Sequence, residues 1–284
     1  MTISQAINKS SLPRLDAEII LAFVIKKPRE FLLTHPNNEL NEPALKIFHF
    51  LEKKRLSNWP AAYLFGYKEF FGLNFQVNPA VLTPRPETEM IVEEIIRLSR
   101  ETERPLIIDI GTGSGVIIIS AAKELKRLEP LLYKQSAFFG LDISAPALKI
   151  AKANAQVHGL ARKITFNRGD LLKPVTGLIA GRDLIIAANL PYLTPTQIKQ
   201  APSISREPRL ALDGGQDGLK YYRCLLVQLK KAKARSIVLI CEIDPAQAKP
   251  LKAIMSKIYP QSLIKIQPDL TKRNRFIIMT IKNS

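Results

Sequence analysis

The sequence predicts an α/β fold: a mostly parallel, doubly wound sheet with an antiparallel edge strand, preceded by a small helical domain. Three observations predict it. Short apolar runs alternate with amphipathic segments from residue 86 onward. A glycine-rich loop at 111–115 follows one of these runs, and a polar loop at 189–192 ends another. Strands that alternate with helices in this way are typical of parallel sheets covered on both faces.

The first part of the chain changes character once. Over 14–56, apolar residues recur at helical spacing and prolines interrupt the pattern, which predicts a small helical domain. Over 66–82, apolar residues alternate with others near two glycines, which predicts a short β-hairpin. We therefore expect three parts: an N-terminal helical domain (1–64), a β-hairpin linker (65–83) and an α/β domain (84–284).

Within the α/β domain, strands and helices are expected to follow one another in a regular order. Apolar runs predict strands at 106–109, 137–142, 164–166, 183–188 and 236–242, with a closing antiparallel pair near 262–268 and 275–281. Amphipathic segments predict helices at 86–98, 115–127, 145–158, 217–233 and 245–258. The first of these helices carries proline and acids in its first turn, as helix N-termini favour.

Composition excludes several classes of protein. The sequence contains no run of 18 apolar residues, and its start lacks the apolar core of a signal peptide, so we expect no membrane span and a cytoplasmic location. Cys224 and Cys241 lack metal-ligand spacing and are expected to be buried thiols in a reducing compartment. The three histidines are scattered, so we expect no metal site.

The net charge of +17 is concentrated near the C-terminus. Residues 220–284 carry 14 basic and 3 acidic side chains, a surplus of +11. One interpretation is a weak contact of this basic region with RNA phosphates. The other is a lysine-rich, solvated surface, and the sequence leaves both open.

One candidate site lies between a strand and a helix, in the glycine-rich loop Gly111-Thr112-Gly113-Ser114-Gly115. Without Cβ atoms the backbone can turn sharply and approach a ligand, and the helix N-terminus offers unpaired N–H donors. The loop can therefore hold a phosphate or the carboxylate of a methionine-like group. Asp109, at the strand end, disfavours a pyrophosphate and favours an ammonium group, directly or through water.

Two further acids follow the next strands. Asp142 ends a strand 27 residues after Gly115 and can accept both hydroxyls of a ribose. Asp170, after the third strand, is either part of the rim of an adenine site or a turn residue. In this order and in a βα frame, the loop and the acid predict a nucleoside cofactor that carries an amino-acid group.

The most informative segment is the loop Asn189-Leu190-Pro191-Tyr192 after an apolar strand. The Asn189 side-chain oxygen and the Leu190 carbonyl can each accept one N–H of a planar NH2 group. Pro191 restricts Leu190 to extended geometry, and Tyr192 offers a flat face. A sulfonium methyl needs no activation, so positioning the nitrogen is the remaining work. The segment predicts methyl transfer to an amide or base nitrogen.

These residues resemble the HemK-type protein-(glutamine-N5) methyltransferases, which modify peptide chain release factors. The resemblance extends from about Arg14 to Ile278, and the segment 82–89 is its most specific part. Its motifs are Arg14–Leu21, Pro60–Gly66, Glu69–Leu73, Leu82–Glu89, Ala211–Leu219, Glu242, and Pro268–Leu270 with Arg275. The resemblance implies a Rossmann-like class I methyltransferase domain and an N-terminal helical domain that recognises the substrate.

The resemblance also implies the reactants. The methyl donor would be S-adenosyl-L-methionine, and the acceptor would be the glutamine of the Gly-Gly-Gln loop of class 1 release factors, which act in translation termination. Cofactor contacts would fall on 111–115, Asp142, Leu171 and Asn189, and substrate contacts on 189–192.

Two residues depart from the family pattern: Leu190 stands where the family usually has proline, and Leu171 stands where some members carry an aromatic residue that would pack on the adenine. The form Asn-Leu-Pro-Tyr also occurs in rRNA adenine dimethyltransferases. An adenine amino group of RNA or DNA, or a glutamine of a ribosomal protein, is therefore an alternative acceptor. A catalytically idle binding module is the non-enzymatic alternative, against which the intact Asn189 and glycine loop argue.

Overall fold

The computed structural model describes residues 1–282, and the chain packs as two compact units. The first unit contains residues 1–67 together with the short segment 201–206. The second contains residues 68–200 and the chain from 207 onward. The predicted division, with 65–83 as a separate linker, stays a prediction.

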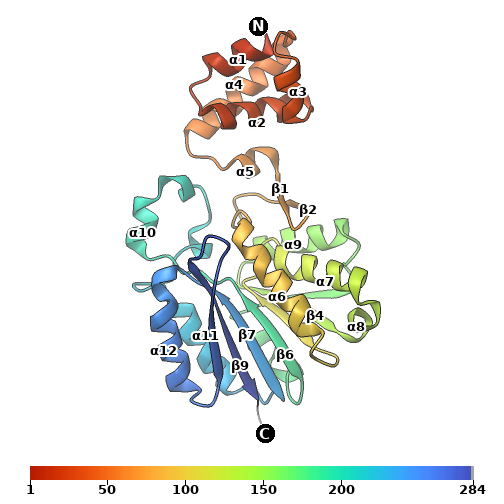
Figure 1. The fold of residues 1–284 in the computed structure, drawn as a ribbon, viewed down its shortest axis with the longest axis vertical. Helices are drawn as coiled ribbons and strands as arrows, with labels where there is room; N and C mark the ends of the chain where they lie inside the picture. The colour runs from red at the N-terminus through yellow and green to blue at the C-terminus, as the bar shows by residue number, and fades with distance from the viewer. Residues whose placement is uncertain (283–284) are drawn as a thin grey trace. The chain divides into compact units, whose positions relative to one another are not determined.

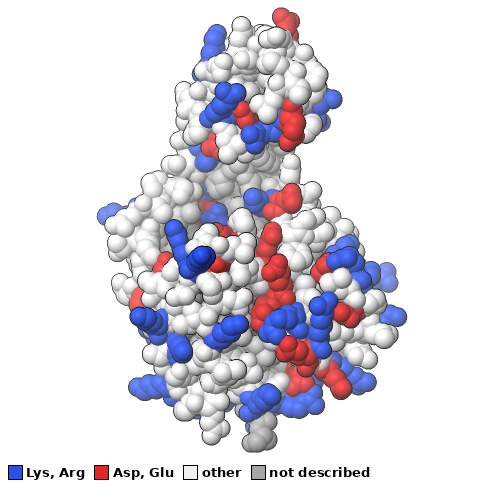
Figure 2. Space-filling view, in the orientation of Figure 1, with Lys and Arg blue, Asp and Glu red and all other residues white. Residues whose placement is uncertain are grey.

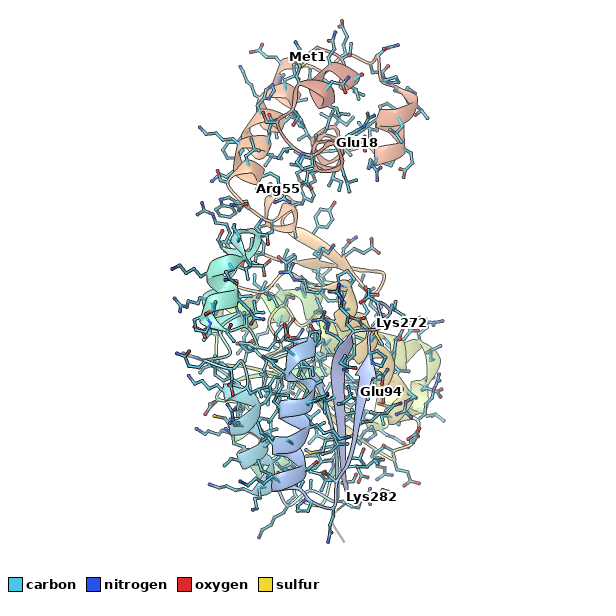
Figure 3. The ribbon with its side chains drawn as sticks, turned by 60° about the vertical axis from the view of Figure 1, so that its left-hand side comes forward. Met1, Glu18, Arg55, Glu94, Lys272 and Lys282 are labelled. Atoms are coloured by element: carbon cyan, nitrogen blue, oxygen red, sulfur yellow. The ribbon has the colours of Figure 1, made fainter. Side chains whose placement is uncertain are left out.

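The first unit is helical, as expected. Its helices are α1 (Ile3–Lys9), α2 (Arg14–Ile25), α3 (Arg29–Thr34), α4 (Glu42–Leu56) and α5 (Ala61–Phe65). Apolar side chains such as Leu21 and Phe48 form its core. Glu18 is buried on α2 (Figure 3). Nε of Arg14 and Nε of Arg29 donate to its two carboxylate oxygens, at 2.9 and 2.8 Å. Both cations offset the cost of burying that charge.

A tight hairpin joins β1 (Tyr67–Phe70) to β2 (Leu73–Gln76). Its two turn residues, Phe71 and Gly72, have φ angles of 51° and 68°. Positive φ at both central positions is the geometry of the turn that best joins two twisted antiparallel strands. The alternation of apolar residues in this segment therefore predicted the hairpin correctly.

The second unit is built on a seven-stranded sheet of order β5-β4-β3-β6-β7-β9-β8 (Figure 1). Its strands are β3 (Leu106–Ile110), β4 (Ala137–Asp142), β5 (Ile164–Arg168), β6 (Asp183–Ala188), β7 (Ser236–Glu242), β8 (Leu263–Pro268) and β9 (Asn274–Lys282). The strands β3 to β7 run parallel, whereas β9 is antiparallel to both β7 and β8. The predicted fold class, including the antiparallel edge, is confirmed.

Helices cover both faces of the sheet. The longer ones are α6 (Glu89–Ser99), α7 (Val116–Leu128), α9 (Ala145–Val157), α11 (Lys220–Lys230) and α12 (Ala248–Ile258). The shorter helices of this unit are α8 (Pro130–Gln135) and α10 (Pro195–Gln200), with the 3-10 helices η1 (Pro86–Thr88), η2 (Lys173–Leu178), η4 (Arg209–Ala211) and η5 (Pro245–Gln247). The 3-10 helix η3 (Pro202–Ile204) belongs to the first unit.

Two apolar layers hold these helices to the sheet. In β3, Ile107 packs with α6 and α7, whereas Ile108 packs with α11 and α12 on the other face. Successive strand residues point to opposite faces and both faces are covered, which explains why the central strands contain consecutive apolar residues. Cys241 is buried in the second layer, but Cys224 is exposed on α11, so the expected burial of both thiols is wrong for Cys224. Within residues 1–282, no helix has the length and apolarity needed to cross a membrane.

The register of the sheet decides where the polar loops meet. Ile110 of β3 pairs with Leu141 of β4 on one side and with Ala188 of β6 on the other. Ala188 in turn pairs with Cys241 of β7. The loops that follow these parallel strands therefore converge at one edge of the sheet, where ligands of open α/β folds bind.

Candidate active site

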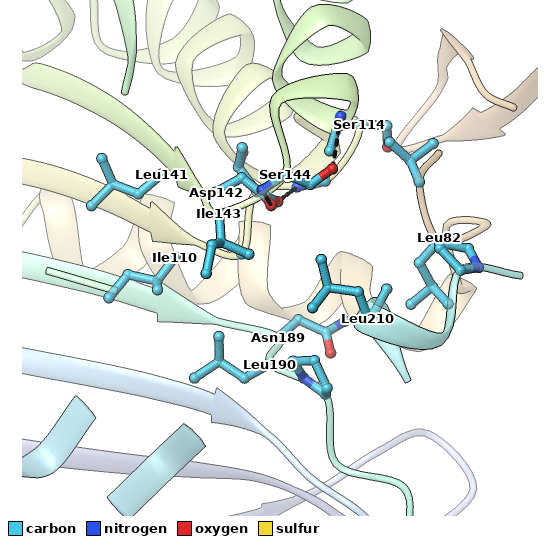
Figure 4. Close-up of a pocket in the computed structure, with 18 of the residues that line it drawn as sticks. Leu82, Ile110, Ser114, Leu141, Asp142, Ile143, Ser144, Asn189, Leu190 and Leu210 are labelled. Carbon is cyan, nitrogen blue, oxygen red and sulfur yellow. Dashed lines mark hydrogen bonds between the residues drawn. The ribbon is translucent and has the colours of Figure 1, made fainter. Parts of the chain in front are cut away.

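A pocket opens at this edge of the second unit (Figure 4). Its walls come from the loops after β3, β4, β5 and β6, and from the segments 80–85 and 208–211. Most of the residues predicted from the sequence line it: Gly111, Thr112, Gly113, Ser114, Asp142, Asp170, Leu171, Asn189, Leu190 and Pro191. Asp109, Gly115 and Tyr192 are not among the lining residues, although each is adjacent to one that is.

The glycine loop is shaped by its neighbours on the sheet. The amides of Gly111 and Thr112 both donate to the Leu141 carbonyl, at 2.8 and 2.9 Å. Gly115 has a φ of +83° and precedes α7, where a Cβ would lie 2.8 Å from Cδ1 of Ile119. Gly115 is therefore required for the turn and for helix packing, while the earlier glycines face the pocket.

Asp142 joins two of the converging loops. Its Oδ2 accepts the Gly113 amide at 2.9 Å, and its Oδ1 accepts the Ser144 amide at 2.8 Å (Figure 4). Burial raises the pKa of this carboxyl, while the backbone donors oppose that rise. Each oxygen keeps a free lone pair, so the carboxylate can still accept hydroxyl donors from a ligand.

Asp109 lies beneath the pocket and is fully buried. The Thr112 hydroxyl donates to its Oδ2 at 2.6 Å, and no partner among residues 1–282 reaches its Oδ1. Burial raises the pKa of this carboxyl to about 7, the Thr112 hydrogen bond lowers it and the Asp142 charge raises it further. The binding of a ligand ammonium group by Asp109 stays a prediction. Thr112, which donates to Asp109, lines the pocket.

The third loop supplies an apolar wall and a charged rim. Leu171 is 7% exposed and has a φ of 55°, a left-handed conformation that leucine rarely adopts. Asp170 beside it forms an ion pair of 2.7 Å with Lys173. The predicted contact of Asp170 with an adenine therefore competes with this surface pair.

Two hydrogen bonds fix the orientation of the Asn189 side-chain amide. Its Nδ2 donates to Oε2 of Glu242 at 3.0 Å and to Oγ1 of Thr88 at 3.2 Å. The Thr88 hydroxyl donates its own hydrogen to Oε2 of Glu242 at 2.7 Å, so it acts as an acceptor toward Asn189. Both partners accept, which fixes the amide nitrogen on their side and leaves the amide oxygen free for the pocket.

Glu242 is the centre of this network. It ends β7, is 2% exposed, and also accepts the Tyr192 hydroxyl on its Oε1 at 3.3 Å. Burial raises the pKa of the Glu242 carboxyl, and its hydrogen bond to Thr88 and the charge of Arg275 lower it. Burial also raises the pKa of Tyr192 far above its usual range, so the phenol stays protonated.

Sequence reasoning gave no chemical role to Thr88 or Glu242, because they lie 101 and 53 residues from Asn189. One signal was available. Glu242 is a lone acid at the end of an apolar strand, and a parallel pairing of that strand with β6 places it beside Asn189. The Tyr192 hydroxyl donates to Glu242, and the expectation that the ring presents a flat face to the substrate stays a prediction.

Comparison with known proteins agrees with both units. Residues 2–66 match the family model of the PrmC N-terminal domain, and residues 103–259 match that of a methyltransferase domain. The release factor glutamine methyltransferase of Moorella thermoacetica is 34% identical over 97% of both chains. The enzymes of the same name from Bacillus cereus and Coxiella burnetii are 32% and 35% identical, over 92% and 87% of this chain.

The chain belongs to the release factor glutamine methyltransferase family. Solved structures of low sequence identity agree on the fold. The hMettl16 catalytic domain, in complex with the MAT2A 3′UTR hairpin 6, superposes with a TM-score of 0.56 at 16% identity and covers 92% of each chain. The human methyltransferase 10 domain containing protein gives a TM-score of 0.52 at 14% identity, over 75% of this chain and 89% of that one.

The residues that line the pocket fit the chemical groups of S-adenosyl-L-methionine. A turn of backbone amides suits its carboxylate, Asp142 suits ribose hydroxyls, and the apolar side chains of Ile143, Leu171 and Leu210 suit its base. The unpaired Oδ1 of Asp109 is a buried acceptor of the kind that an ammonium group or a water would satisfy.

Proposed function

We propose that this enzyme transfers the methyl group of S-adenosyl-L-methionine to the side-chain amide nitrogen, N5, of the glutamine in the Gly-Gly-Gln loop of class 1 peptide chain release factors. The observation that carries the proposal is the fixed orientation of the Asn189 amide at the pocket wall. The relatives named above support the acceptor, since they match over nearly the whole chain. Release factors act on ribosomes, so we expect the enzyme to work in the cytoplasm.

The residues that would hold the cofactor are Gly111 to Ser114, Asp142 and Leu171. When bound there, S-adenosyl-L-methionine supplies a sulfonium whose methyl carbon is a strong electrophile. The chain therefore has no need to activate the donor, and its own work concerns the acceptor nitrogen and the exclusion of water.

An amide nitrogen is a poor nucleophile, because its lone pair is delocalised into the carbonyl. Asn189 Oδ1 would accept one N–H of the glutamine NH2, and the Leu190 carbonyl would accept the other. Two acceptors in fixed positions oppose planarity and turn the nitrogen lone pair toward the methyl carbon. After the C–N bond forms, the cationic nitrogen loses a proton to water.

Leu190 can replace the usual proline in this scheme without loss. Its side chain is 3% exposed and packs toward the glycine loop, where a Cβ on Gly111 would lie 3.2 Å from its Cδ2. The side chain thus fills the floor of the pocket, while the acceptor role needs only the backbone carbonyl. Pro191 follows in both forms and limits the backbone of the residue before it.

The direct experiment is incubation of the protein with methyl-labelled cofactor and a release factor. We expect one label on the Gly-Gly-Gln glutamine and none on a factor whose loop glutamine is replaced by alanine. Label that persists on the replaced factor, or label on protein-free RNA instead, would contradict the proposal. An adenine amino group also presents two N–H groups, so the RNA arm tests the alternative acceptor directly.

We also propose a weak RNA contact for the basic C-terminal region. The helices α11 and α12 lie side by side on one face of the sheet and carry six basic and no acidic residues in sequence. In Figure 2, basic side chains lie over the position of α12 with little acidic charge near them. The exposed basic residues are Lys220, Arg223, Lys230, Lys249, Lys252 and Lys257.

Salt dependence tests this contact. Each phosphate neutralised contributes a slope of about −0.7 in a plot of log affinity against log salt for single-stranded RNA. Changing Lys249, Lys252 and Lys257 together to glutamine should weaken binding to a short RNA and make the slope shallower by up to about 2. An unchanged slope would favour a solvated surface with no RNA role.

A further inference from the structure

We propose that Glu242 is a positioning residue of the transfer reaction: its carboxylate holds the Asn189 amide in the reactive orientation, and its negative charge favours the acceptor nitrogen as that nitrogen becomes cationic. This inference rests on the proposed function and deepens it. Neither the sequence motifs nor the family relationship assigns a chemical role to Glu242.

The hydrogen-bond pattern supports the proposal that Glu242 holds the Asn189 amide in one orientation. The three groups that meet the Glu242 carboxylate are donors: the Asn189 amide at 3.0 Å, the Thr88 hydroxyl at 2.7 Å and the Tyr192 hydroxyl at 3.3 Å. An ionised carboxylate only accepts, so these donors cannot exchange roles with it. If the Asn189 amide were reversed, its oxygen would face two acceptor atoms. Glu242 therefore decides which end of that amide meets the substrate.

The surroundings of the Glu242 carboxylate support the proposal that its negative charge favours the cationic nitrogen. Among the described residues, none forms an ion pair with this carboxylate, although it is 2% exposed. The charge of Arg275 lowers the pKa of Glu242, but the Arg275 side chain donates to Asp269 and to the Ile243 carbonyl, both at 3.4 Å. A buried carboxylate without a paired cation costs stability, and a neutral glutamine would avoid that cost. The three donors around the carboxylate favour its ionised form, in which the negative charge is available to the reaction.

Methyl transfer is a step in which positive charge moves. The S–CH3 bond breaks with its electron pair going to sulfur, the nitrogen lone pair forms the new N–CH3 bond, and the nitrogen carries the positive charge until it loses a proton. A negative charge behind Asn189 is attracted more strongly to this late cation than to the neutral amide. Groups that are fixed in place and aimed at a developing charge stabilise it more in a site that excludes water than they would in water.

The protonation state of Glu242 sets a pH dependence. The groups that face it are Thr88 and Glu87 from η1, Asn189 and Tyr192 from the loop after β6, Arg275 from β9, and Tyr222 of α11, whose hydroxyl donates to the Glu242 main-chain carbonyl. Burial raises the pKa of Glu242, and Glu87 adds to the rise. Protonation would turn one oxygen into a donor and release the Asn189 amide. Transfer at saturating cofactor should therefore decline as the pH falls.

Glu242→Gln is the decisive variant, with Glu124→Gln on the outer side of α7 as a matched control. We expect kcat to fall on the order of 10²-fold in Glu242→Gln, cofactor Kd to change less than about threefold, and the acid decline of kcat to disappear. Glu242→Asp, which keeps the charge on a shorter side chain, should recover part of kcat. The control should match the wild type in kcat and in pH profile.

A purely structural role predicts another pattern, in which Glu242→Gln lowers thermal stability and cofactor affinity together and keeps the acid decline of kcat. That pattern, or a kcat within about twofold of the wild type, would overturn the inference. If Glu242→Gln does not fold, the wild-type protein carries the test: the side-chain amide resonance of Asn189 should titrate with the midpoint of the kcat decline, and a pH-independent resonance would overturn it.

The two proposals can fail separately. If wild-type protein labels no release factor glutamine, the proposed function fails. The Asn189 amide resonance still decides whether Glu242 holds that amide, because this measurement needs no acceptor. If the wild type labels the glutamine and Glu242→Gln labels it equally fast, the proposed function stands and the inference about Glu242 is wrong.

Discussion

Replacing Asn189 by alanine separates binding of the cofactor from use of the cofactor. The change removes one of two proposed acceptors for the glutamine NH2, and loss of one positioned hydrogen-bond partner of a transition state costs about 10²- to 10³-fold in kcat, or roughly 2.7–4 kcal/mol. The cofactor would keep the glycine loop and Asp142. Its Kd should therefore change by less than about tenfold, or roughly 1.4 kcal/mol.

The same change should destabilise the fold by a predictable amount. Oε2 of Glu242 would keep the Thr88 hydroxyl at 2.7 Å and lose the Asn189 amide at 3.0 Å. A hydrogen bond to a charged group contributes about 1.5–3 kcal/mol, so the free energy of unfolding should fall by about that much.

Three measurements on purified protein check these values: single-turnover labelling of a release factor, calorimetric titration with cofactor, and urea unfolding. Asn167→Ala is a matched control, since Asn167 is half-buried on β5 and does not line the pocket. It should leave transfer and cofactor affinity unchanged. Full activity of Asn189→Ala would refute the positioning model, and a cofactor Kd weakened by much more than tenfold would mean that Asn189 serves the cofactor first.

Three further predictions concern the cofactor side of the pocket. Asp142→Asn should raise the cofactor Kd by about tenfold or more, with a smaller effect on kcat at saturating cofactor, because the amide replaces one acceptor oxygen by a donor. Titration calorimetry measures the Kd, and labelling of a release factor measures kcat. A larger effect on kcat than on the Kd would contradict the proposed contact with the ribose. Gly115→Ala should lower the free energy of unfolding by about 1–3 kcal/mol, because a Cβ there would lie 2.8 Å from Cδ1 of Ile119 and φ is +83°. An unchanged midpoint of urea unfolding would contradict this prediction. The pKa of Asp109 is raised to about 7, so the unfolding free energy of the cofactor-free protein should decline as the pH rises from about 4 through 7. Asp109→Asn should make that decline shallower without abolishing it, because burial also raises the pKa of Asp142 and of Glu242. Equal pH slopes in the two proteins would contradict the role of Asp109.

The order of strands and the loops of the site could be predicted because both depend on local pattern. Uninterrupted apolar runs such as 184–188 specify buried strands, and parallel strands place their following loops at one edge. The short helices α8 and α10 were not predicted, since six residues carry too little periodicity to identify a helix.

The hydrogen-bond network of the site could not be read from the sequence. Thr88, Asn189 and Glu242 are brought together by strand pairing and by packing of the segment before α6, across 154 residues between the first and last. For the same reason the sequence could not show that the Tyr192 hydroxyl binds Glu242 or that Asp109 lies below the pocket wall. Residue types and spacing identified the chemistry, and tertiary contacts determined its orientation.

The most direct test of the central claim is a crystal structure of the protein with demethylated cofactor and a release factor. We expect the glutamine amide nitrogen within about 3 Å of Asn189 Oδ1, with Asn189 Nδ2 still bound to Glu242. An amide nitrogen out of hydrogen-bond reach of that oxygen, or an Asn189 amide turned with its NH2 toward the substrate, would contradict it.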